Sequence, residues 1–342
     1  MTYQNSEIRA MRPFLIAATL ALLGAAAAAG DLAAADRALP LKVGIIGLDT
    51  SHVVAFAQVI RDAKAGEDLA GLKIVAAYPG GSRDIPQSWD RVKQFTEQLR
   101  GMNVEIVGSI DELLKKVDAV MLESVDGRPH LAQARPVIAA GKPLFIDKPM
   151  AASLADALEI FRLAGEKKVP CFSASSLRFS SGFQAFRRKT SPLGDVKSCV
   201  AWGPLHVEPH HPELFWYGIH GVEILFTIMG PGCKTVARAA PDKVVGVWAD
   251  GRTGTFLAKE GYGARVEGTR GSGPAGEYEG YKPLVVEIAR FFKSGRPPVS
   301  AEETLEILAF MEAAEESKRA GGAPVTIESV MTKARQQAAA PR

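Results

Sequence analysis

The segment that most constrains the fold lies at residues 43–52 and reads Val43-Gly44-Ile45-Ile46-Gly47-Leu48-Asp49-Thr50-Ser51-His52. An apolar strand that ends in a glycine turn and enters a helix opens the nucleotide-binding βαβ unit, whose turn follows the pattern G-x-G-x-x-G. Counted from Gly47, the second and third glycine positions hold Asp49 and His52. A carboxylate repels phosphate, and an imidazole adds bulk where helix and strand must pack closely. The segment therefore predicts the fold, while its turn departs from the residues that admit a pyrophosphate.

Strand and helix patterns alternate over the first part of the chain. Apolar strand patterns lie at 41–47, 73–78, 105–107, 117–122 and 143–146, and helical patterns lie at 51–64, 111–116 and 130–140. Such alternation predicts a parallel sheet with helices on both faces. We expect a Rossmann-like, doubly wound α/β domain at residues 41–150.

The pattern changes after residue 150. Helical patterns lie at 153–166, 216–229, 284–293 and 301–318, and strand patterns lie at 170–174, 198–202, 235–239, 244–248 and 254–258. Strands that dominate one region, with helices between and after them, are typical of an α+β domain. We expect such a domain, with a mostly antiparallel sheet, at residues 151–335.

The first forty residues have the three-part pattern of a secretory signal. Arg9 and Arg12 form a short basic region, residues 13–29 are uncharged and mostly apolar, and small residues follow. We expect an export signal at residues 1–30, a linker at 31–40 and a periplasmic or extracellular protein, with cleavage near Gly30 or after Ala35. The apolar run has the length of a short membrane span, so an uncleaved anchor is the alternative. Once the signal is removed, we expect no stable membrane span.

Composition excludes several classes of protein. The chain has 342 residues, of which 47% are hydrophobic and 23% charged, as in ordinary folded domains. The net charge is only +3 and no dense Lys/Arg run occurs, so nucleic acid is not an expected partner. Cys171, Cys199 and Cys233 are far apart without CxxC spacing, which indicates buried thiols or one disulfide with an odd cysteine left over.

Asp147-Lys148-Pro149 is the strongest candidate for chemistry. It follows the fifth predicted strand, at the carboxyl edge of the sheet, where ligands bind in open α/β folds. A lysine at this place can donate a proton or hold a sugar hydroxyl. The alternative is a surface lysine in a tight turn.

A second candidate lies in the predicted helix at 216–229. Tyr217, His220 and Glu223 are spaced three apart and share one helix face. A carboxylate one turn from a histidine can fix the imidazole tautomer, which makes an acid/base pair. The alternative is a histidine that simply packs against the sheet.

Four of the six histidines cluster at His206, His210, His211 and His220, with Glu208 and Glu213 nearby. Imidazole and carboxylate groups suit zinc or another divalent metal. Pro209 and Pro212 interrupt the region, so helical ligand spacing is absent and we predict no metal site there. Loop histidines beside a sugar site are the favoured interpretation, and a divalent metal is the alternative.

The second predicted strand ends in Tyr78-Pro79-Gly80-Gly81-Ser82-Arg83. An NAD-selective unit carries Asp or Glu here for the ribose hydroxyls, and none occurs before Asp84. Ser82 and Arg83 can take a 2′-phosphate, which favours NADP, although a plain surface turn explains them equally well.

The order of these features resembles the glucose–fructose oxidoreductase/inositol dehydrogenase family (Gfo/Idh/MocA). The resemblance covers about residues 41–330 and rests on the strand–turn opening, the D/E-K-P turn and a G-x-H-x-x-D/E helix at 218–223, with Val117-Asp118-Ala119-Val120 and Pro129-His130 between them. It implies a nicotinamide cofactor, NAD or NADP, in the first domain and a sugar or polyol between the domains. The second-domain sheet often pairs subunits in this family, so the resemblance also implies a homo-oligomer.

The family's site residues can be carried over by position. Lys148 matches its catalytic lysine, and His220 matches the histidine that helps move the hydroxyl proton while hydride goes to the nicotinamide. The usual acidic residue four before the histidine is Trp216 here, so Tyr217 or Glu223 would take that role. The implied substrate side is Arg178, His206, His210 and Trp216, where a solvated Arg178 is the equal alternative; the implied cofactor side is Gly44, Gly47, Asp49, Thr50, Ser51, His52, Ser82, Arg83, Asp147 and Lys148.

Three functions follow from the sequence. The first is an exported NAD(P)-dependent oxidoreductase that acts on a sugar or polyol. The second is a cofactor-independent lyase or hydrolase on a keto-sugar or glycoside, in which Lys148, His220 and Tyr217 transfer protons and Asp49 and His52 join them. The third is a non-enzymatic carbohydrate-binding protein. A Sec-like signal exports unfolded chain, which fits the first function poorly because the cofactor would have to be acquired outside the cytoplasm.

Overall fold

The computed structural model describes residues 40–62 and 66–340, and the expected export signal lies outside these residues. None of the described helices is both long and apolar enough to cross a membrane. Cys171, Cys199 and Cys233 are free and buried, so the thiol interpretation is confirmed.

The first sheet is six-stranded, and its paired strands all run parallel, in the order β3-β2-β1-β4-β5-β6. Its strands are β1 (Leu41–Ile46), β2 (Leu72–Tyr78), β3 (Glu105–Ile106), β4 (Ala119–Leu122), β5 (Leu144–Asp147) and β6 (Cys171–Ala174). Strand order reverses between β1 and β4, which is the switch point where such sheets open a crevice at their carboxyl ends. The predicted doubly wound α/β fold is confirmed.

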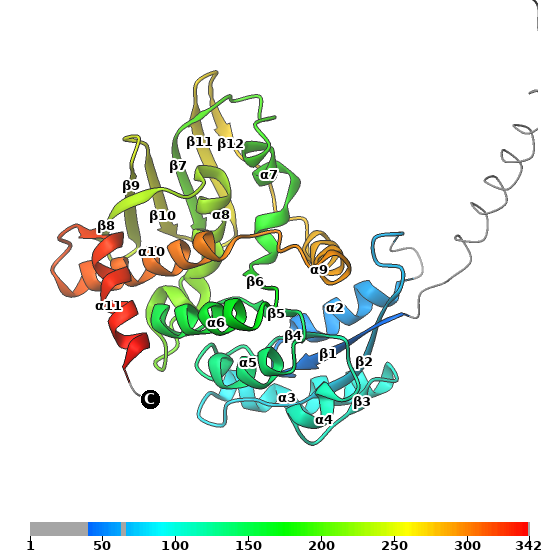
Figure 1. Ribbon diagram of the computed structural model, residues 1–342. Helices are drawn as coiled ribbons and strands as arrows, with labels where there is room; N and C mark the ends of the chain where they lie inside the picture. Colours follow the sequence, from blue (N-terminus) through cyan, green and yellow to red (C-terminus); the bar gives the residue numbers. More distant parts are fainter. Residues whose placement is uncertain (1–39, 63–65, 341–342) are drawn as a thin grey trace, which may run out of the picture. The chain divides into compact units, whose positions relative to one another are not determined.

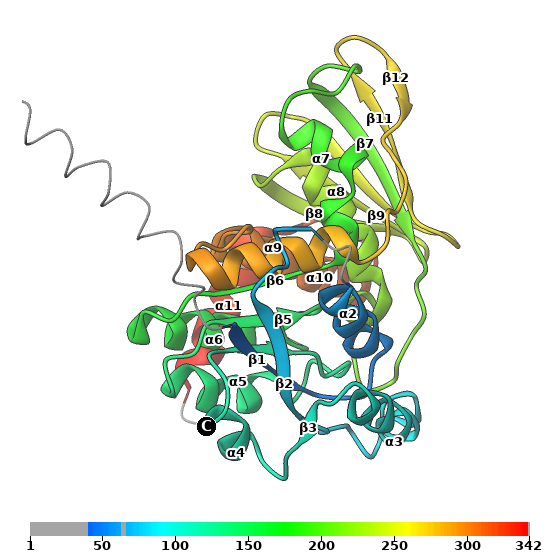
Figure 2. The same ribbon diagram turned by 90° about the vertical axis from the view of Figure 1, so that its right-hand side faces the viewer.

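Successive residues of these strands face opposite sides of the sheet and enter two different cores. Ile46 and Leu122 pack on the side of α4 (Ile110–Leu114), α5 (His130–Ala139) and α6 (Leu154–Lys167). Ile45 and Met121 pack on the side of α2 (Ser51–Arg61), α3 (Pro86–Gly101) and α9 (Lys282–Ser294). Figure 2 shows α2 and α9 on the same side of the sheet.

The second sheet has seven strands in the order β12-β11-β7-β10-β9-β8-β13. They are β7 (Val196–Gly203), β8 (Cys233–Ala240), β9 (Lys243–Trp248), β10 (Thr253–Ala258), β11 (Gly263–Gly268), β12 (Ser272–Pro274) and β13 (Val325–Thr326). Only the β7–β10 pair is parallel, so the predicted mostly antiparallel sheet is confirmed. Helices α8 (Ile219–Met229) and α10 (Ala301–Arg319) pack on it (Figure 1).

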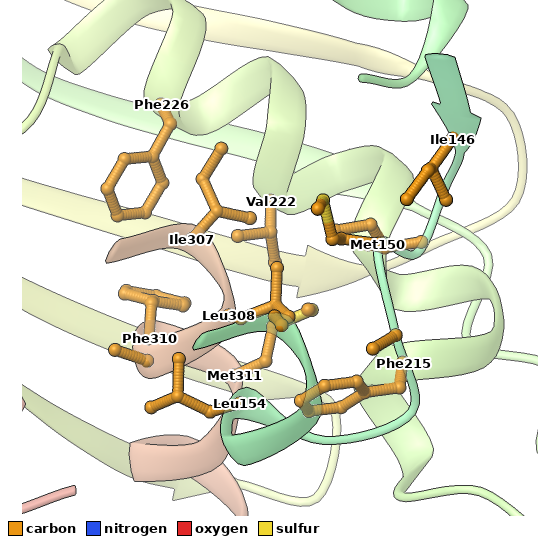
Figure 3. Close-up of a cluster of buried hydrophobic side chains, with 14 of the residues drawn as sticks. Ile146, Met150, Leu154, Phe215, Val222, Phe226, Ile307, Leu308, Phe310 and Met311 are labelled. Atoms are coloured by element: carbon orange, nitrogen blue, oxygen red, sulfur yellow. The ribbon is translucent and has the colours of Figure 1, made fainter. Parts of the chain in front are cut away.

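The two sheets share one hydrophobic core. Ile146 of β5 and Met150, in the turn that follows it, pack in the same cluster as Val222 of α8 and Leu308 of α10 (Figure 3). Strand β6 pairs with β5, and α9 covers the first sheet although it follows the second in sequence. The sequence boundary at residue 150 therefore does not divide the two sheets, because β6 and α9 lie beyond it and belong to the first.

Helix α8 is held tightly and carries the predicted histidine. A π-helical turn (Leu214–Gly218) leads into it, and every one of its residues is buried. A Cβ atom on Gly221 would lie 2.6 Å from the ring of Phe256 on β10, so glycine is needed for the helix to lie this close to the sheet. This close packing fixes the position of the neighbouring His220.

Three described helices were not predicted from the sequence, namely α3, α7 (Ser181–Arg187) and α11 (Ile327–Ala339). A 3₁₀ turn (Ser176–Phe179) also follows β6. Of these elements, α3 matters most for the site, because its first turn lies against the turn that follows β1.

Candidate active site

A cavity of about 140 Å³ lies at the carboxyl edge of the first sheet, against the start of α8. It brings together Lys148, Tyr217 and His220, for which the sequence predicts proton transfer. The rest of its wall is rich in aromatic and hydroxyl groups and is formed by Thr50, Ser51, His52, Gln87, Arg91, Val125, Ser176, Leu177, Trp216, Tyr262, Tyr278 and Tyr281. A polar cavity with aromatic walls suits a small hydroxylated ligand.

Lys148 and Tyr217 face each other across this cavity. Lys148 directly follows β5 and is only 7% exposed, and its Nζ lies 6.0 Å from the centre of the Tyr217 ring. At the far wall, burial raises the pKa of Tyr262 and Tyr278 to about 12 each. Both phenols therefore stay protonated at neutral pH and can donate hydrogen bonds to a ligand.

His220 is oriented by a serine of the first sheet. Its Nδ1 lies 2.8 Å from Oγ of Ser175, the residue that follows β6. Burial, followed by the charges of Lys148 and His52, lowers the pKa of His220 well below its usual range. The imidazole is therefore neutral at neutral pH and can accept a proton.

Glu223 and Arg178 form a buried ion network instead of facing a substrate. Glu223 accepts hydrogen bonds from Arg178 Nε at 2.6 Å and from the Ser175 backbone at 3.2 Å, and Arg178 also donates to Glu303 at 2.8 Å. Arg178 is only 2% exposed. The expected direct His220–Glu223 pair is thus replaced by contacts of both residues with Ser175, and the expected substrate-side arginine is a structural one.

In the turn after β1 the required glycine is present, but a buried carboxylate lies where a phosphate site has a second glycine. Gly47 has a φ of +86°, and a Cβ there would lie 2.3 Å from Ser124 Oγ, so this glycine is required. Asp49 is fully buried and accepts hydrogen bonds from Ser88 Oγ at 2.6 Å and from the Val125 backbone at 3.0 Å. Thr50 caps α2, whereas Gly44 packs against Leu113 of α4.

A dinucleotide binds such a sheet across the crevice between β1 and β4. Here Asp49 bridges this crevice to Val125, and Ile85, Val125 and Trp216 form a buried apolar cluster beside it. The remaining cavity of about 140 Å³ is smaller than the roughly 300–1,000 Å³ typical of sites for drug-sized ligands. The residues present therefore do not fit a dinucleotide bound across this crevice.

A second set of contacts, around Asp126, lies at the same carboxyl edge of the first sheet. Asp126 accepts hydrogen bonds from Ser82 at 2.5 Å and from Arg128, and its Oδ1 lies 3.0 Å from Nε2 of His211. Arg128 also binds Asp84 in a bidentate pair at 2.9 Å. Ser82, proposed for a 2′-phosphate, thus has a protein partner, and Arg83 stacks over a tryptophan ring, that of Trp89, at 4.9 Å.

The clustered histidines do not share one site. His206 is exposed near Glu260 and packs against the Tyr217 ring, whereas His210 pairs with Glu208 at 2.6 Å. His211 is buried against Trp216. Only His220 of these four lines the cavity, so the structure does not bring His206 and His210 into it.

A buried cluster of His52, Glu123 and Asp147 lies directly behind the cavity wall. His52 Nδ1 is 2.7 Å from Asp147 Oδ2, and one potential ligand atom from each of the three residues lies within 4.8 Å of the other two. Burial first, and then the charge of Asp147, raises the pKa of Glu123 well above its usual range. Glu123 was not predicted from the sequence, although its place directly after the buried strand β4 could have indicated a residue at the site.

Comparison with known proteins supports the family resemblance seen in the sequence. Residues 41–175 match the family model described as "Oxidoreductase family, NAD-binding Rossmann fold" with the name GFO_IDH_MocA. No functionally curated protein matches the chain.

Several solved structures share the fold over most of the chain. A putative NADPH-dependent oxidoreductase from Desulfitobacterium hafniense is 19% identical with a TM-score of 0.68, over 86% of this chain and 99% of that one. A probable dehydrogenase from Thermotoga maritima is 21% identical with a TM-score of 0.66, over 85% and 100%. The myo-inositol dehydrogenase of Lactobacillus casei, solved with NAD(H) and myo-inositol, is 18% identical with a TM-score of 0.65, over 84% and 97%. At these identities the likeness establishes the fold alone.

Proposed function

We propose, from the premise that residues 41–175 belong to the Gfo/Idh/MocA oxidoreductase family, that this chain is an enzyme acting on a sugar or polyol derivative by proton transfer. The reacting groups would be its own Lys148, His220 and Tyr217, with no dinucleotide in the crevice. The observation that carries the proposal is the Asp49–Val125 bridge. It closes the cofactor crevice, while the cavity beside it keeps the two residues that match the family's catalytic lysine and histidine.

The chemistry that fits these groups is β-elimination from a keto-glycoside. Neutral His220 would take the proton from the carbon next to the keto group, and the electron pair left behind would form an enolate. The Lys148 ammonium would stabilise the negative oxygen of this enolate. The enolate would then expel the β-alkoxy group, which leaves as an alcohol after it takes a proton from Tyr217 or from protonated His220.

Two features of the cavity support a hydroxylated substrate. Tyr262 and Tyr278 offer both phenol donors and ring faces. Ser176 adds a hydroxyl whose Oγ is hydrogen-bonded to Tyr278 Oη at 3.1 Å. The family neighbour from Lactobacillus casei was solved with myo-inositol, a polyol. A sugar or polyol is therefore the substrate class that we propose.

The test is turnover without added cofactor. Purified protein is incubated with a 3-keto-glycoside, and release of the alcohol and formation of the enone are followed by mass spectrometry. We expect turnover that NAD and NADP leave unchanged and that His220→Gln lowers by at least about 100-fold. If the protein is folded and still turns over no keto-glycoside, the proposal is contradicted.

An NAD(P)-dependent oxidoreductase is the second candidate, favoured by the match of residues 41–175 to an NAD-binding family. It requires the Asp49 bridge and the Trp216 cluster to open. Native mass spectrometry for bound nicotinamide and thermal shifts with NAD and NADP decide between the two candidates. Bound nicotinamide, or a clear thermal shift with either form, would favour the oxidoreductase and also answer which form binds.

We further propose that the protein is exported, because residues 1–30 have the composition of a secretory signal. A chain that needs no dinucleotide is compatible with a compartment that does not supply one. Cell fractionation with an antibody to the mature part tests this proposal, and size-exclusion chromatography with light scattering tests the expected homo-oligomer.

Sugar binding that survives Lys148→Ala and His220→Ala, without any turnover, would instead indicate a non-enzymatic carbohydrate-binding protein.

A further inference from the structure

We propose that His52, Glu123 and Asp147 form a site for a divalent transition metal ion such as Zn²⁺ or Mn²⁺. The three side chains come from the ends of three neighbouring elements: His52 from the first turn of α2, Glu123 from the residue after β4, and Asp147 from the end of β5. Strands β4 and β5 are adjacent in the sheet, so the fold itself brings the two carboxylates together. This site is separate from the loop histidines considered from the sequence.

The spacing of the ligand atoms fits a single ion. Each residue offers an atom within 4.8 Å of those of the other two. Two ligand atoms on one tetrahedral ion with bonds of about 2.0–2.2 Å lie roughly 3.3–3.6 Å apart, so the His52–Asp147 pair would have to widen and a ligand atom at the 4.8 Å limit would have to move inwards by about 1 Å. A bound cation would replace the proton of the 2.7 Å hydrogen bond between His52 and Asp147.

The unsatisfied oxygens of the cluster point independently to a missing partner. Glu123 is fully buried, and neither of its carboxylate oxygens has a hydrogen-bond partner among the described residues. Asp147 Oδ1 is also buried without such a partner in the same part of the chain. Buried carboxylates are normally paired, hydrogen-bonded or bound to a metal. Among the described residues, no hydrogen-bond partner accounts for the burial of the Glu123 carboxylate.

The charges around the cluster are compatible with a cation. Two carboxylates, Glu123 and Asp147, face one ammonium group, that of Lys148, and the more distant Asp49 adds negative charge on the Glu123 side. One imidazole and two carboxylates form a mixed nitrogen and oxygen donor set. Such a set favours Zn²⁺ or Mn²⁺ over Ca²⁺ and Mg²⁺, which take mostly oxygen ligands.

The site would open towards the proposed substrate. His52 and Lys148 both line the cavity, whereas Glu123 and Asp147 lie behind its wall. Three protein ligands leave at least one coordination position for water or for a substrate oxygen, as in catalytic zinc sites. This catalytic use rests on the proposed function, but metal binding itself does not.

The test is metal retention by the purified protein. The protein is stripped with a chelator, given Zn²⁺ or Mn²⁺ alone, desalted and analysed for metal by plasma mass spectrometry, with calorimetry for affinity. We expect a single ion per chain and a raised melting temperature. Glu123→Gln should weaken affinity by more than the 10–100-fold that loss of a second-shell partner costs. Glu315→Gln, which alters a buried carboxylate outside the cluster, should bind as the wild type does.

Two outcomes would overturn the site. One is a wild-type protein that retains no metal and melts at the same temperature with and without it, which would mean that Glu123 is simply a protonated acid. The other is Glu123→Gln protein with wild-type affinity. Where Glu123→Gln fails to fold, the wild-type retention and the absorption spectrum of the Co²⁺-loaded wild type decide the question. Cofactor-free turnover that is unchanged after complete chelation would contradict a catalytic role for the metal while leaving the proposed function standing.

Discussion

Asp49 accepts a hydrogen bond from the backbone N–H of Val125 at 3.0 Å, and this contact joins the two sides of the crevice between β1 and β4. The same carboxylate accepts from Ser88 Oγ at 2.6 Å, which ties the first turn of α3 to the crevice. A residue that disrupts the phosphate pattern in the sequence thus has a definite structural role. Asp49 contacts Ser88 and Val125 at the position where the G-x-G-x-x-G pattern has a glycine beside the pyrophosphate.

Restoring glycine at this position should cost stability and give no cofactor binding. Asp49→Gly would leave the Val125 N–H and the Ser88 hydroxyl without their buried acceptor, a loss of roughly 1–3 kcal/mol in the free energy of unfolding. The Trp216 cluster would still fill the space beside the turn. Urea denaturation measures the loss, and calorimetric titration with NAD and NADP measures binding. Tight binding by the single variant would show that Asp49 alone closes the crevice.

Arg178 should be among the most sensitive positions for folding. Arg178→Met leaves the buried carboxylates of Glu223 and Glu303 without their shared partner, which typically costs about 3–5 kcal/mol. Arg290→Met, which breaks an exposed pair with Asp68, is the matched control and should cost roughly 0–1 kcal/mol. Chemical denaturation of both variants provides the comparison. Equal effects would contradict the structural role assigned to Arg178.

Ser175 is expected to act as a positioning residue for His220. Loss of the base in His220→Gln should lower turnover by about 10²–10⁴-fold, the usual contribution of a general base. Ser175→Ala should lower kcat by a smaller factor with KM nearly unchanged, because it removes the 2.8 Å contact with the imidazole and Ser175 does not itself line the cavity. Ser175→Thr keeps the hydroxyl and should restore part of the rate. Steady-state kinetics distinguishes these outcomes, and a KM effect without a kcat effect would contradict the assignment.

The first sheet could be predicted from the sequence because strands buried on both faces form short apolar runs, as in β4 and β5. Helix α3 carried a weaker signal. Pro86 stands at its start, and Phe95 and Leu99 are buried on one face, but most of its residues are polar or charged. Without α3, the sequence could not reveal that Ser88 lies against Asp49 across the crevice.

Of the candidate site, the sequence could predict the residues that follow strands but not their partners. Lys148 follows β5 and therefore reaches the ligand edge by topology alone. The environment of Arg178 depends on Glu223 and Glu303, which lie 45 and 125 residues away along the chain. Contacts at such separations are set by tertiary packing, so a local pattern cannot distinguish a buried arginine from a solvated one.

The pH dependence of stability should report on Asp126. Burial opposes ionisation of this carboxyl, but the adjacent His211 and the hydrogen bonds from Arg128 and Ser82 outweigh it and hold the pKa well below its usual range. A depressed pKa in the folded state means that the contribution is fully present above the unfolded pKa of about 3.9. It is then lost as pH falls through the lower folded pKa. The difference in free energy of unfolding between the wild type and Asp126→Asn should therefore be constant near neutral pH and should shrink below about pH 4. Urea denaturation across that range measures it, and a difference that does not change with pH would contradict the ionised network at this edge.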